Sequence, residues 1–226
     1  MQKNISVAID GPAGSGKSTV ADMLAKRLSF VHMDTGAMYR AIGYKALSCK
    51  TDLNSEAAVC AVMKDTDIDV RFDSKLVQRV YIDGVDITDK IRTNEVSDAA
   101  SKVASLACVR ERLVNLQRDI ACKYSVVLEG RDTCKYVLPE AEVKVYLTAS
   151  TRERAMRRLN ELQAKGLDNG KSLDEMMNEI EERDYRDMHR ALSPLSVADD
   201  ARIIDSTDMT IEEVCDMIIK MVEEVI

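Results

Sequence analysis

The clearest chemical signature in this chain is a glycine-rich loop near its start. The segment GPAGSGKS, from Gly11 to Ser18, fits the pattern G-x-x-x-x-G-K-[ST] at every position. Glycines let the backbone curl so that successive N–H groups point inward, toward a bound anion. Lys17 can reach the β- and γ-phosphates of a nucleotide, and the Ser18 hydroxyl can ligate Mg²⁺. The loop therefore predicts a site for a nucleoside triphosphate, and we expect ATP.

The loop defines the residues expected around ATP and Mg²⁺. The predicted ATP contacts are Gly11, Pro12, Ala13, Gly14, Ser15, Gly16, Lys17, Ser18 and Thr19. Ser18 is the expected metal ligand. The nearby carboxylates Asp34 and Glu129 either assist through water or serve as caps and solvated groups, and both readings stay open.

Short apolar runs that alternate with helical patterns must position this loop. Residues 5–9 read as a buried strand directly before the loop, and residues 17–29 as the helix after it. Further strands are expected at 126–128, 143–147 and 202–205. Helices are expected after Thr35 and at 55–65, 151–165, about 172–191 and 210–225, and residues 95–123 are expected to form one helix or two. This order predicts an α/β fold in which a parallel sheet is flanked by helices.

A segment of different character interrupts the α/β pattern. Between 67 and 93, apolar and polar residues alternate, and Asp83-Gly84 separates two such runs. Alternation broken by Asp-Gly is a strong hairpin signal, so we expect a small antiparallel patch there. The stretch GLDNG, from Gly166 to Gly170, reads as a flexible joint.

Composition limits the possible functions. The 226 residues carry a net charge of −7, which argues against binding nucleic acid through bulk electrostatics. No apolar run is long enough to span a membrane, and the N-terminus lacks a signal-peptide layout, so we expect a cytoplasmic protein. The cysteines at 49, 60, 108, 122, 134 and 215 form no C-x-x-C pair. We therefore expect reduced thiols and no zinc site.

A phosphate-binding loop serves several classes of protein. A GTPase would be expected to show the base-reading motif N-K-x-D, which is missing from the sequence, and a motor or translocase usually needs a longer chain. A kinase of a small acceptor is the leading interpretation. A non-catalytic, nucleotide-gated binding module is the rival.

A kinase must hold two anionic substrates together, so its site needs arginines near strand ends and on helices. Four groups qualify: residues 34–40 with Arg40, Ser101 with Arg110, residues 129–132 with Arg131, and residues 181–195. On a helix with about 100° per residue, Asp187 and Arg190 fall within roughly 40° of Arg183. These three side chains are therefore expected on one face, although an ordinary solvated helix surface gives a similar pattern.

The chain also resembles a known family from end to end. IDGPAGSGKST, DTGAMYRA, IRTNEVSDAASKVA, VRERL, LEGRD, ERDYRDMHRALSPL and DSTDMTIEEV occur in this order. They are similar to the motifs of bacterial-type cytidylate kinases, a branch of the nucleoside monophosphate kinases. The resemblance implies transfer of phosphate from ATP to CMP and dCMP with Mg²⁺, by direct in-line attack.

The resemblance also implies roles for individual residues. Those expected to bind CMP are Thr35, Tyr39, Arg40, Ser101, Arg110, Arg131, Asp132, Arg183, Asp187 and Arg190. Those expected to act on the transferred phosphate are Lys17, Arg40, Arg131, Arg157 and Arg158, and Arg154 belongs to the same arginine-rich stretch. Residues 205–208 are expected near the adenine. The implied partners are the small-molecule substrates alone, with no nucleic acid and no membrane, bound by a monomer.

The implied organisation is a single kinase domain over 1–226. An acceptor-binding insertion spans about 34–108, with its antiparallel patch at 67–93, and a helical lid spans about 151–170. One departure stands out: where the family has a residue and then Gly-Thr after Gly-Arg-Asp, this chain has Thr133-Cys134-Lys135. Loss of that glycine is expected to stiffen or redirect the loop. A kinase with another acceptor, UMP or shikimate, remains an alternative.

Overall fold

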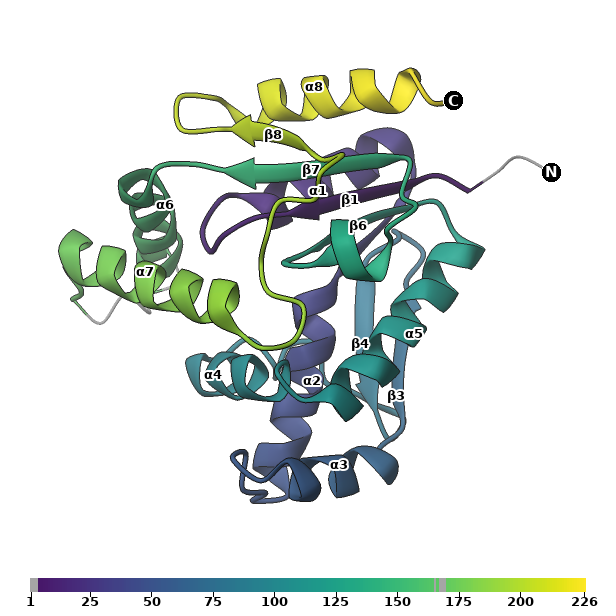
Figure 1. Cartoon of the computed structure of the whole chain (residues 1–226), viewed down its shortest axis with the longest axis vertical. Helices are drawn as coiled ribbons and strands as arrows, with labels where there is room; N and C mark the ends of the chain where they lie inside the picture. The colour runs from purple at the N-terminus through teal and green to yellow at the C-terminus, as the bar shows by residue number, and fades with distance from the viewer. Residues whose placement is uncertain (1–3, 165, 167–169) are drawn as a thin grey trace. The chain divides into compact units, whose positions relative to one another are not determined.

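The computed structural model describes residues 4–164, 166 and 170–226. The chain divides into two compact units. The P-loop unit comprises Ile5–Ser29 and Val127–Ile226, and the middle unit comprises Phe30–Val126 together with Asn4. Both units contain helices and strands (Figure 1). Among the described helices, none has the length and apolar character that crossing a membrane requires.

The P-loop unit is built on parallel strands. Its elements are β1 (Ser6–Asp10), α1 (Lys17–Leu28), β6 (Val126–Gly130), a π-helical turn (Thr133–Val137), β7 (Val143–Thr148), α6 (Thr151–Ala164), α7 (Leu173–His189), β8 (Arg202–Asp205) and α8 (Ile211–Glu223). The strands lie in the order β6-β1-β7-β8 (Figure 1). β1 and β8 both run parallel to β7, with Asp10 opposite Tyr146 and Asp205 opposite Thr148. The predicted parallel sheet with flanking helices is confirmed.

Two groups of helices complete this unit. α1 and α8 pack together, and an ion pair of 2.7 Å joins Arg27 to Asp216 at their surface. α6 and α7 share a separate apolar cluster made by Ala155, Leu162, Met176 and Ile180. Ser172 begins α7 as one half of a reciprocal capping box, in which its side chain and that of Glu175 each accept the other's backbone N–H. Part of the predicted joint at 166–170 lies outside the described residues.

The middle unit combines helices with a small antiparallel sheet. Its elements are β2 (Val31–Asp34), α2 (Thr35–Ser48), α3 (Glu56–Lys64), β3 (Ile68–Phe72), β4 (Gln78–Ile82), β5 (Val85–Asp86), α4 (Asn94–Val103) and α5 (Ala107–Lys123). The sheet has the order β3-β4-β5. Asp83 and Gly84 join β4 to β5 with φ of 51° and 77°, the positive values that a tight two-residue hairpin needs. The predicted Asp-Gly hairpin is confirmed.

Helix packing in the middle unit depends on one glycine. Gly43 lies inside α2, where a Cβ atom would come within 2.9 Å of the Ala100 backbone nitrogen on α4. The missing side chain lets these two helices approach closely. Buried Met38, Ile42 and Val103 fill the surrounding core. The residues of α2 are thereby fixed against α4.

The structure corrects the expectation that all six cysteines are reduced. Cys60 on α3 and Cys108 on α5 form a disulfide with a Cα–Cα distance of 6.0 Å, a normal spacing for such a bond. They are 48 residues apart in the chain, so their spacing in the sequence gave no indication of the pair. Cys49 and Cys122 are free and exposed, whereas Cys134 and Cys215 are free and buried.

Candidate active site

The glycine-rich loop connects β1 to α1 in the P-loop unit. Gly14 and Gly16 take φ of 74° and 89°, a region that residues with side chains rarely adopt. A Cβ atom on Gly11 would come within 2.0 Å of the Leu147 carbonyl oxygen on β7. The loop can therefore run directly over the ends of the strands, because it has no side chains at these points. Its N–H groups lead into the N-terminus of α1, which favours a bound phosphate.

Lys17 and Ser18 carry the polar groups of this loop. Lys17 is buried, and its Nζ donates to the Pro12 carbonyl oxygen at 2.6 Å and to Ser15 Oγ at 3.1 Å. Burial, with the added charge of Arg131, lowers the pKa of Lys17 well below its ordinary value. A phosphate at the loop would offset both effects. A phosphate bound at the loop should therefore raise the pKa of Lys17 and favour its charged form.

A hydroxyl and a carboxylate that could bind a metal ion lie beside the loop. Ser18 Oγ donates to Oε2 of the buried Glu129 at 2.9 Å. Glu129 is the last residue but one of the buried strand β6, so the strand places the carboxylate near the carboxyl end of the sheet. A hydroxyl and a carboxylate are the hard oxygen ligands that Mg²⁺ prefers, so these residues fit such an ion.

A buried ion pair clamps the loop from the side of α6 and α7. Arg154 and Asp184 form an ion pair, and both side chains are nearly inaccessible to solvent. Asp184 Oδ1 accepts from the Ala13 backbone N–H at 2.9 Å, and Arg154 Nη1 donates to the Ala13 carbonyl oxygen at 2.8 Å. The pair thus holds both polar groups of one loop residue. Sequence reasoning missed Asp184.

Asp184 nevertheless left a signal in the sequence. The buried residues of α7 are Met176, Ile180, Asp184 and Asp187, which follow one another at helical spacing. A carboxylate that continues an apolar stripe indicates a buried charge with a partner. The position of Asp184 in this stripe therefore predicts a buried, paired carboxylate.

The residues of this unit that are predicted to bind the acceptor CMP also form ion pairs. Arg131 Nε and Asp187 Oδ2 are 2.9 Å apart, and Arg190 Nη2 and Asp132 Oδ1 are 3.2 Å apart. Burial disfavours the charge of Asp187, but Arg131, Arg183 and Arg190 outweigh it and hold the pKa of Asp187 below its usual range. The structure therefore brings all five predicted acceptor residues of this unit into one electrostatic cluster.

The expectation that Arg190 shares a helical face with Arg183 and Asp187 is wrong in one respect. α7 ends at His189, and Arg190 has an extended backbone with ψ of 143°. Its side chain Nε donates to the Ser193 carbonyl oxygen at 2.7 Å. Arg190 reaches Asp132 from the segment after the helix. Pro194 prevents the helix from continuing through that position, and Ser193 before it has a positive φ of 47°.

The departure at Thr133-Cys134-Lys135 forms a π-helical turn. Buried Asp10 accepts hydrogen bonds from Thr133 N–H at 2.8 Å, Thr133 Oγ1 at 2.6 Å and Cys134 N–H at 2.8 Å. No residue of this turn has positive φ, so the backbone does not require the family's glycine. Lys135 is exposed, and burial raises the pKa of the Cys134 thiol. The turn is fixed, and Cys134 is an unreactive thiol.

The arginines of α6 differ in their surroundings. Arg157 donates to the Ser206 carbonyl oxygen at 2.7 Å and pairs with Glu153 at 2.9 Å. One of its guanidinium nitrogens lies 3.7 Å from where a Cβ atom on Gly16 would sit. Arg158 instead pairs at the surface with Glu161. Of the two predicted catalytic arginines of α6, Arg157 is therefore the one that lies against the loop.

The remaining predicted residues belong to the middle unit. Asp34 caps α2 by accepting from the Ala37 backbone N–H at 3.1 Å, and its other oxygen pairs with Arg40 at 2.5 Å. Burial opposes the charge of Asp34, but Arg40 holds its pKa below the usual range. Thr35 is buried as the first residue of α2. Of the two readings of Asp34, the structure shows the cap.

Tyr39 and Arg110 lie together in the same unit. The Arg110 guanidinium lies 5.8 Å from the centre of the Tyr39 ring, and both side chains are buried. Arg110 Nη1 also donates to the Ala104 carbonyl oxygen at 3.3 Å. Ser101 lies half-buried on α4. The predicted acceptor residues are thus divided between the two units.

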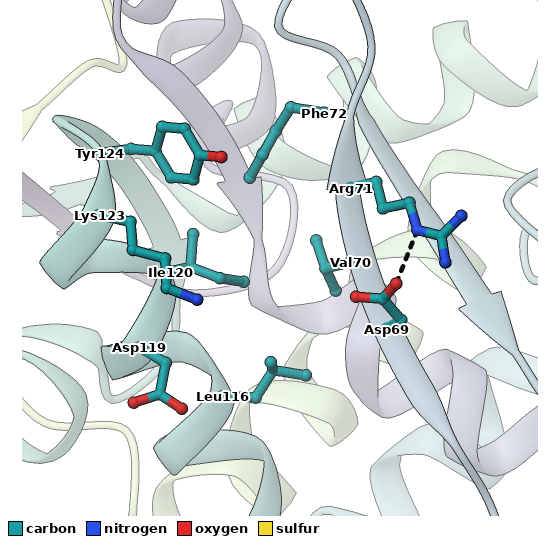
Figure 2. Close-up of a pocket in the computed structure, with 9 residues that line it drawn as sticks. All are labelled: Asp69, Val70, Arg71, Phe72, Leu116, Asp119, Ile120, Lys123 and Tyr124. Carbon is teal, nitrogen blue, oxygen red and sulfur yellow. Dashed lines mark hydrogen bonds and ion pairs between the residues drawn. The ribbon is translucent and has the colours of Figure 1, made fainter.

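A cavity of about 290 Å³ in the middle unit contains none of the predicted site residues (Figure 2). It lies between β3 and α5, with Phe72 and Tyr124 edge-to-face at one end and the Asp69–Arg71 ion pair at its side. Two acidic and two basic side chains line it, so its charges balance. It lacks the excess of positive charge that a phosphorylated substrate needs.

Comparison with known proteins identifies the family of this chain. A family model described as cytidylate kinase matches residues 7–224. A cytidylate kinase of Caldicellulosiruptor saccharolyticus is 47% identical over 99% of this chain and 98% of its own length. One from Bacillus licheniformis is 46% identical with the same coverage.

A solved structure of an uncharacterised Eubacterium ventriosum protein shares the fold, with a TM-score of 0.55 and 18% identity over 98% of this chain and 99% of its own. The phosphate-binding loop, the arginine–carboxylate pairs and the matches along the whole chain lead to one conclusion: this protein belongs to the cytidylate kinase family.

Proposed function

We propose that this chain transfers the γ-phosphoryl group of ATP to CMP and dCMP, giving ADP and CDP or dCDP. The observation that carries the proposal is the P-loop unit itself, where a complete phosphate-binding loop adjoins a cluster of paired arginines and carboxylates. The kinship to cytidylate kinases over 99% of the chain supports CMP as the acceptor over UMP or shikimate.

Positioning and electrostatics supply the catalysis. A phosphate oxygen of CMP attacks the γ-phosphorus of ATP, the bond to the β,γ-bridging oxygen breaks in line, and ADP leaves with that oxygen. Lys17 and the loop N–H groups hold the β- and γ-phosphates. Arg131, Arg40 and Arg157 neutralise the charge that gathers between donor and acceptor. No covalent intermediate on the protein is needed.

The divalent ion that such kinases need fits Ser18, with Glu129 behind it. When bound, it would neutralise charge on the phosphates of ATP. In this proposal, Asp34 positions Arg40 and plays no direct part in metal binding, because it already caps α2 and pairs with that arginine.

The CMP contacts in this proposal are assigned residue by residue from the family resemblance. Asp187 and Arg183 hold the sugar, and Asp132, Arg190, Arg110, Ser101 and Thr35 read the base. Tyr39, Arg40 and Arg131 hold the acceptor phosphate. Cytosine presents two acceptors and one amine donor, which arginine, hydroxyl and carboxylate groups match. A base with another pattern would leave buried groups unpaired, which costs far more than a lost contact.

The mechanism also needs exclusion of water, because water would otherwise compete as the acceptor. α6 and the segment that follows, about 151–170, form the lid in this proposal, and the middle unit supplies the acceptor-binding insertion of about 34–108. Arg157 reaches the phosphates as the lid closes. We assign the protein as a monomer.

The test is a coupled ADP-release assay with CMP, dCMP, UMP and AMP as acceptors. CMP and dCMP should be phosphorylated at least tenfold more efficiently than UMP in terms of kcat/KM, which corresponds to about 1.4 kcal/mol. A reversed preference would overturn the acceptor assignment.

Lys17→Ala should lower kcat by about 100-fold or more, the effect of losing one preorganised charge donor. Lys26→Ala, which removes an exposed lysine of the same helix, is the matched control and should leave kcat unchanged. If the unaltered protein transfers no phosphate to any acceptor, the chain is a nucleotide-binding module instead.

A further inference from the structure

Three potential metal ligands meet on two helices of the middle unit, apart from every residue assigned above. Glu56 is the first residue of α3, Cys60 lies one turn later, and Cys108 is the second residue of α5. Their carboxylate oxygen and sulfur atoms all lie within 4.8 Å of one another. The two sulfurs are bonded to each other in this structure, and reduction would free them as thiols.

The two helices also contact each other away from the disulfide. Val59 and Met63 of α3 are buried, as are Val109 and Leu113 of α5. Arg112 on α5 also donates a hydrogen bond to the Met63 carbonyl oxygen. Reduction should therefore leave Cys60 and Cys108 facing each other with little change in backbone spacing.

We propose that Glu56, Cys60 and Cys108 form a site for a soft divalent cation, Zn²⁺ by preference, in the dithiol form of the protein. Zn²⁺ binds thiolate sulfur at about 2.3 Å and carboxylate oxygen at about 2.0–2.2 Å in tetrahedral geometry. The three ligand atoms already lie within 4.8 Å of one another, and the two cysteine Cα atoms are 6.0 Å apart. Rotation of the three side chains is therefore enough to reach the tetrahedral arrangement. Water completes the four ligands.

The ligand chemistry favours Zn²⁺ over Mg²⁺. Two thiolates are soft ligands, whereas Mg²⁺ demands an octahedron of oxygen atoms. Cys108 lies in the first turn of α5, where the free backbone N–H groups stabilise a thiolate. Glu56 is exposed and both cysteines are half-buried, so the cation has direct access from solvent. The Glu56 side chain makes no hydrogen bond or ion pair with another described residue.

The disulfide and the metal site exclude each other. A dithiol reductant delivers two electrons and two protons, which break the Cys60–Cys108 bond into two thiols as the reductant closes to its own disulfide. Zn²⁺ then binds both sulfurs with release of the two thiol protons. In the oxidised form neither sulfur carries a thiolate charge. The site is therefore present only in the reduced protein.

Cobalt binding to the full chain tests the proposal, because Co²⁺ reports thiolate ligands through its absorption spectrum. The protein carries Cys49→Ser and Cys122→Ser to remove the exposed free thiols, and is reduced and freed of reductant without oxygen. We expect a thiolate-to-metal charge-transfer band that saturates at one Co²⁺ per chain and is lost on displacement by Zn²⁺. The same protein in its disulfide form should show no such band.

Substitutions identify the ligands. Cys60→Ser or Cys108→Ser should abolish the charge-transfer band. Glu56→Gln should keep the band but weaken binding by more than the roughly 10- to 100-fold that loss of an outer partner costs. Glu111→Gln, at an exposed glutamate of α5, is the matched control and should bind like the parent protein.

Equal cobalt spectra for the oxidised and reduced protein would overturn the proposal, as would a band that survives both cysteine substitutions. The oxidised comparison needs no substitution, so it remains decisive even if a variant fails to fold. Metal binding is measured without substrates, and its outcome is separate from that of the kinase assay.

Discussion

The two units hold their predicted site residues in different ways. In the P-loop unit, the ion pairs join residues far apart in the chain, with Arg154 bonded to Asp184 and Arg131 to Asp187 across 30 and 56 positions. In the middle unit, the main ion pair of the predicted site is local, since Arg40 pairs with Asp34 only six positions away. Tyr39 and Arg110 are placed by the packing of whole helices.

This difference shows where each unit is vulnerable. Buried pairs between distant elements fix the loop and the predicted acceptor-binding arginine Arg131 in the unliganded protein, but removal of one partner leaves the other charge buried without a counter-charge. Local capping and helix packing place residues with less electrostatic cost. Substitutions in the P-loop unit should therefore damage both stability and catalysis, whereas those in the middle unit should act mainly on acceptor binding.

The largest effect is expected from Asp184→Asn. The substitution leaves the buried guanidinium of Arg154 without its counter-charge, which should lower the free energy of unfolding by about 3–5 kcal/mol. Because the pair also holds both polar groups of Ala13, kcat should fall in parallel. Urea unfolding and initial rates measure the two effects.

The matched control is Asp216→Asn, which breaks the exposed pair with Arg27 and should cost no more than about 1 kcal/mol. Equal losses for the two variants would mean that the Arg154–Asp184 pair has no special role. The double variant Arg154→Met with Asp184→Leu should regain part of the lost stability but not the lost kcat, because it removes the stranded charge without restoring the clamp.

A smaller effect is expected on KM for CMP, for one variant in each unit. Asp187→Ala and Arg110→Met should each raise KM for CMP roughly 10- to 100-fold, since a hydrogen bond to a charged group is worth about 1.5–3 kcal/mol. KM for ATP should change little. Arg186→Ala alters an exposed neighbour on the same helix as Asp187 and should leave both constants alone. If Arg110→Met also leaves KM for CMP unchanged, the middle unit does not hold the base.

The smallest effect concerns pH. The folded-state pKa of Asp187 is lowered, so its contribution to stability is fully present above about 3.9 and is lost as the pH falls through the folded value. The stability difference between the parent protein and Asp187→Asn should therefore shrink toward low pH in urea unfolding curves.

Asp34→Asn should show the same trend, because Arg40 also lowers the pKa of Asp34. A difference between parent and variant that stays constant with pH would show that the two carboxylates titrate alike in the folded and unfolded chains. If the stability difference depends on pH for only one of the two variants, only that carboxylate has a lowered pKa in the folded protein.

Much of the fold could be predicted because the signals are local. The apolar runs at 126–128, 143–147 and 202–205 become β6, β7 and β8, and Ser55 caps α3 as expected. The short strand Val31–Asp34 was missed, since four residues with alternating burial hardly differ from a loop that precedes a helix. The end of α7 was placed two residues late, at 191 instead of His189.

The site was predicted less completely, because its partners meet only in three dimensions. The loop could be recognised from spacing alone, and the pairs Arg131–Asp187 and Arg190–Asp132 fall among residues singled out by family resemblance. Neither spacing nor resemblance indicated that Arg154 clamps Ala13, or that Cys60 meets Cys108. Contacts of this kind depend on how helices pack, which no local pattern encodes.

Asp10 has a consequence for how the two substrates influence each other. It is the residue immediately before the phosphate loop, and its carboxylate accepts three hydrogen bonds from the turn that follows Arg131 and Asp132. Asp10 therefore links the start of the loop directly to the turn beside the predicted CMP-binding residues, and we expect an adjustment of the loop on binding ATP to reach that turn. Linkage then requires reciprocity: whatever factor ATP applies to the affinity for CMP, CMP must apply to the affinity for ATP.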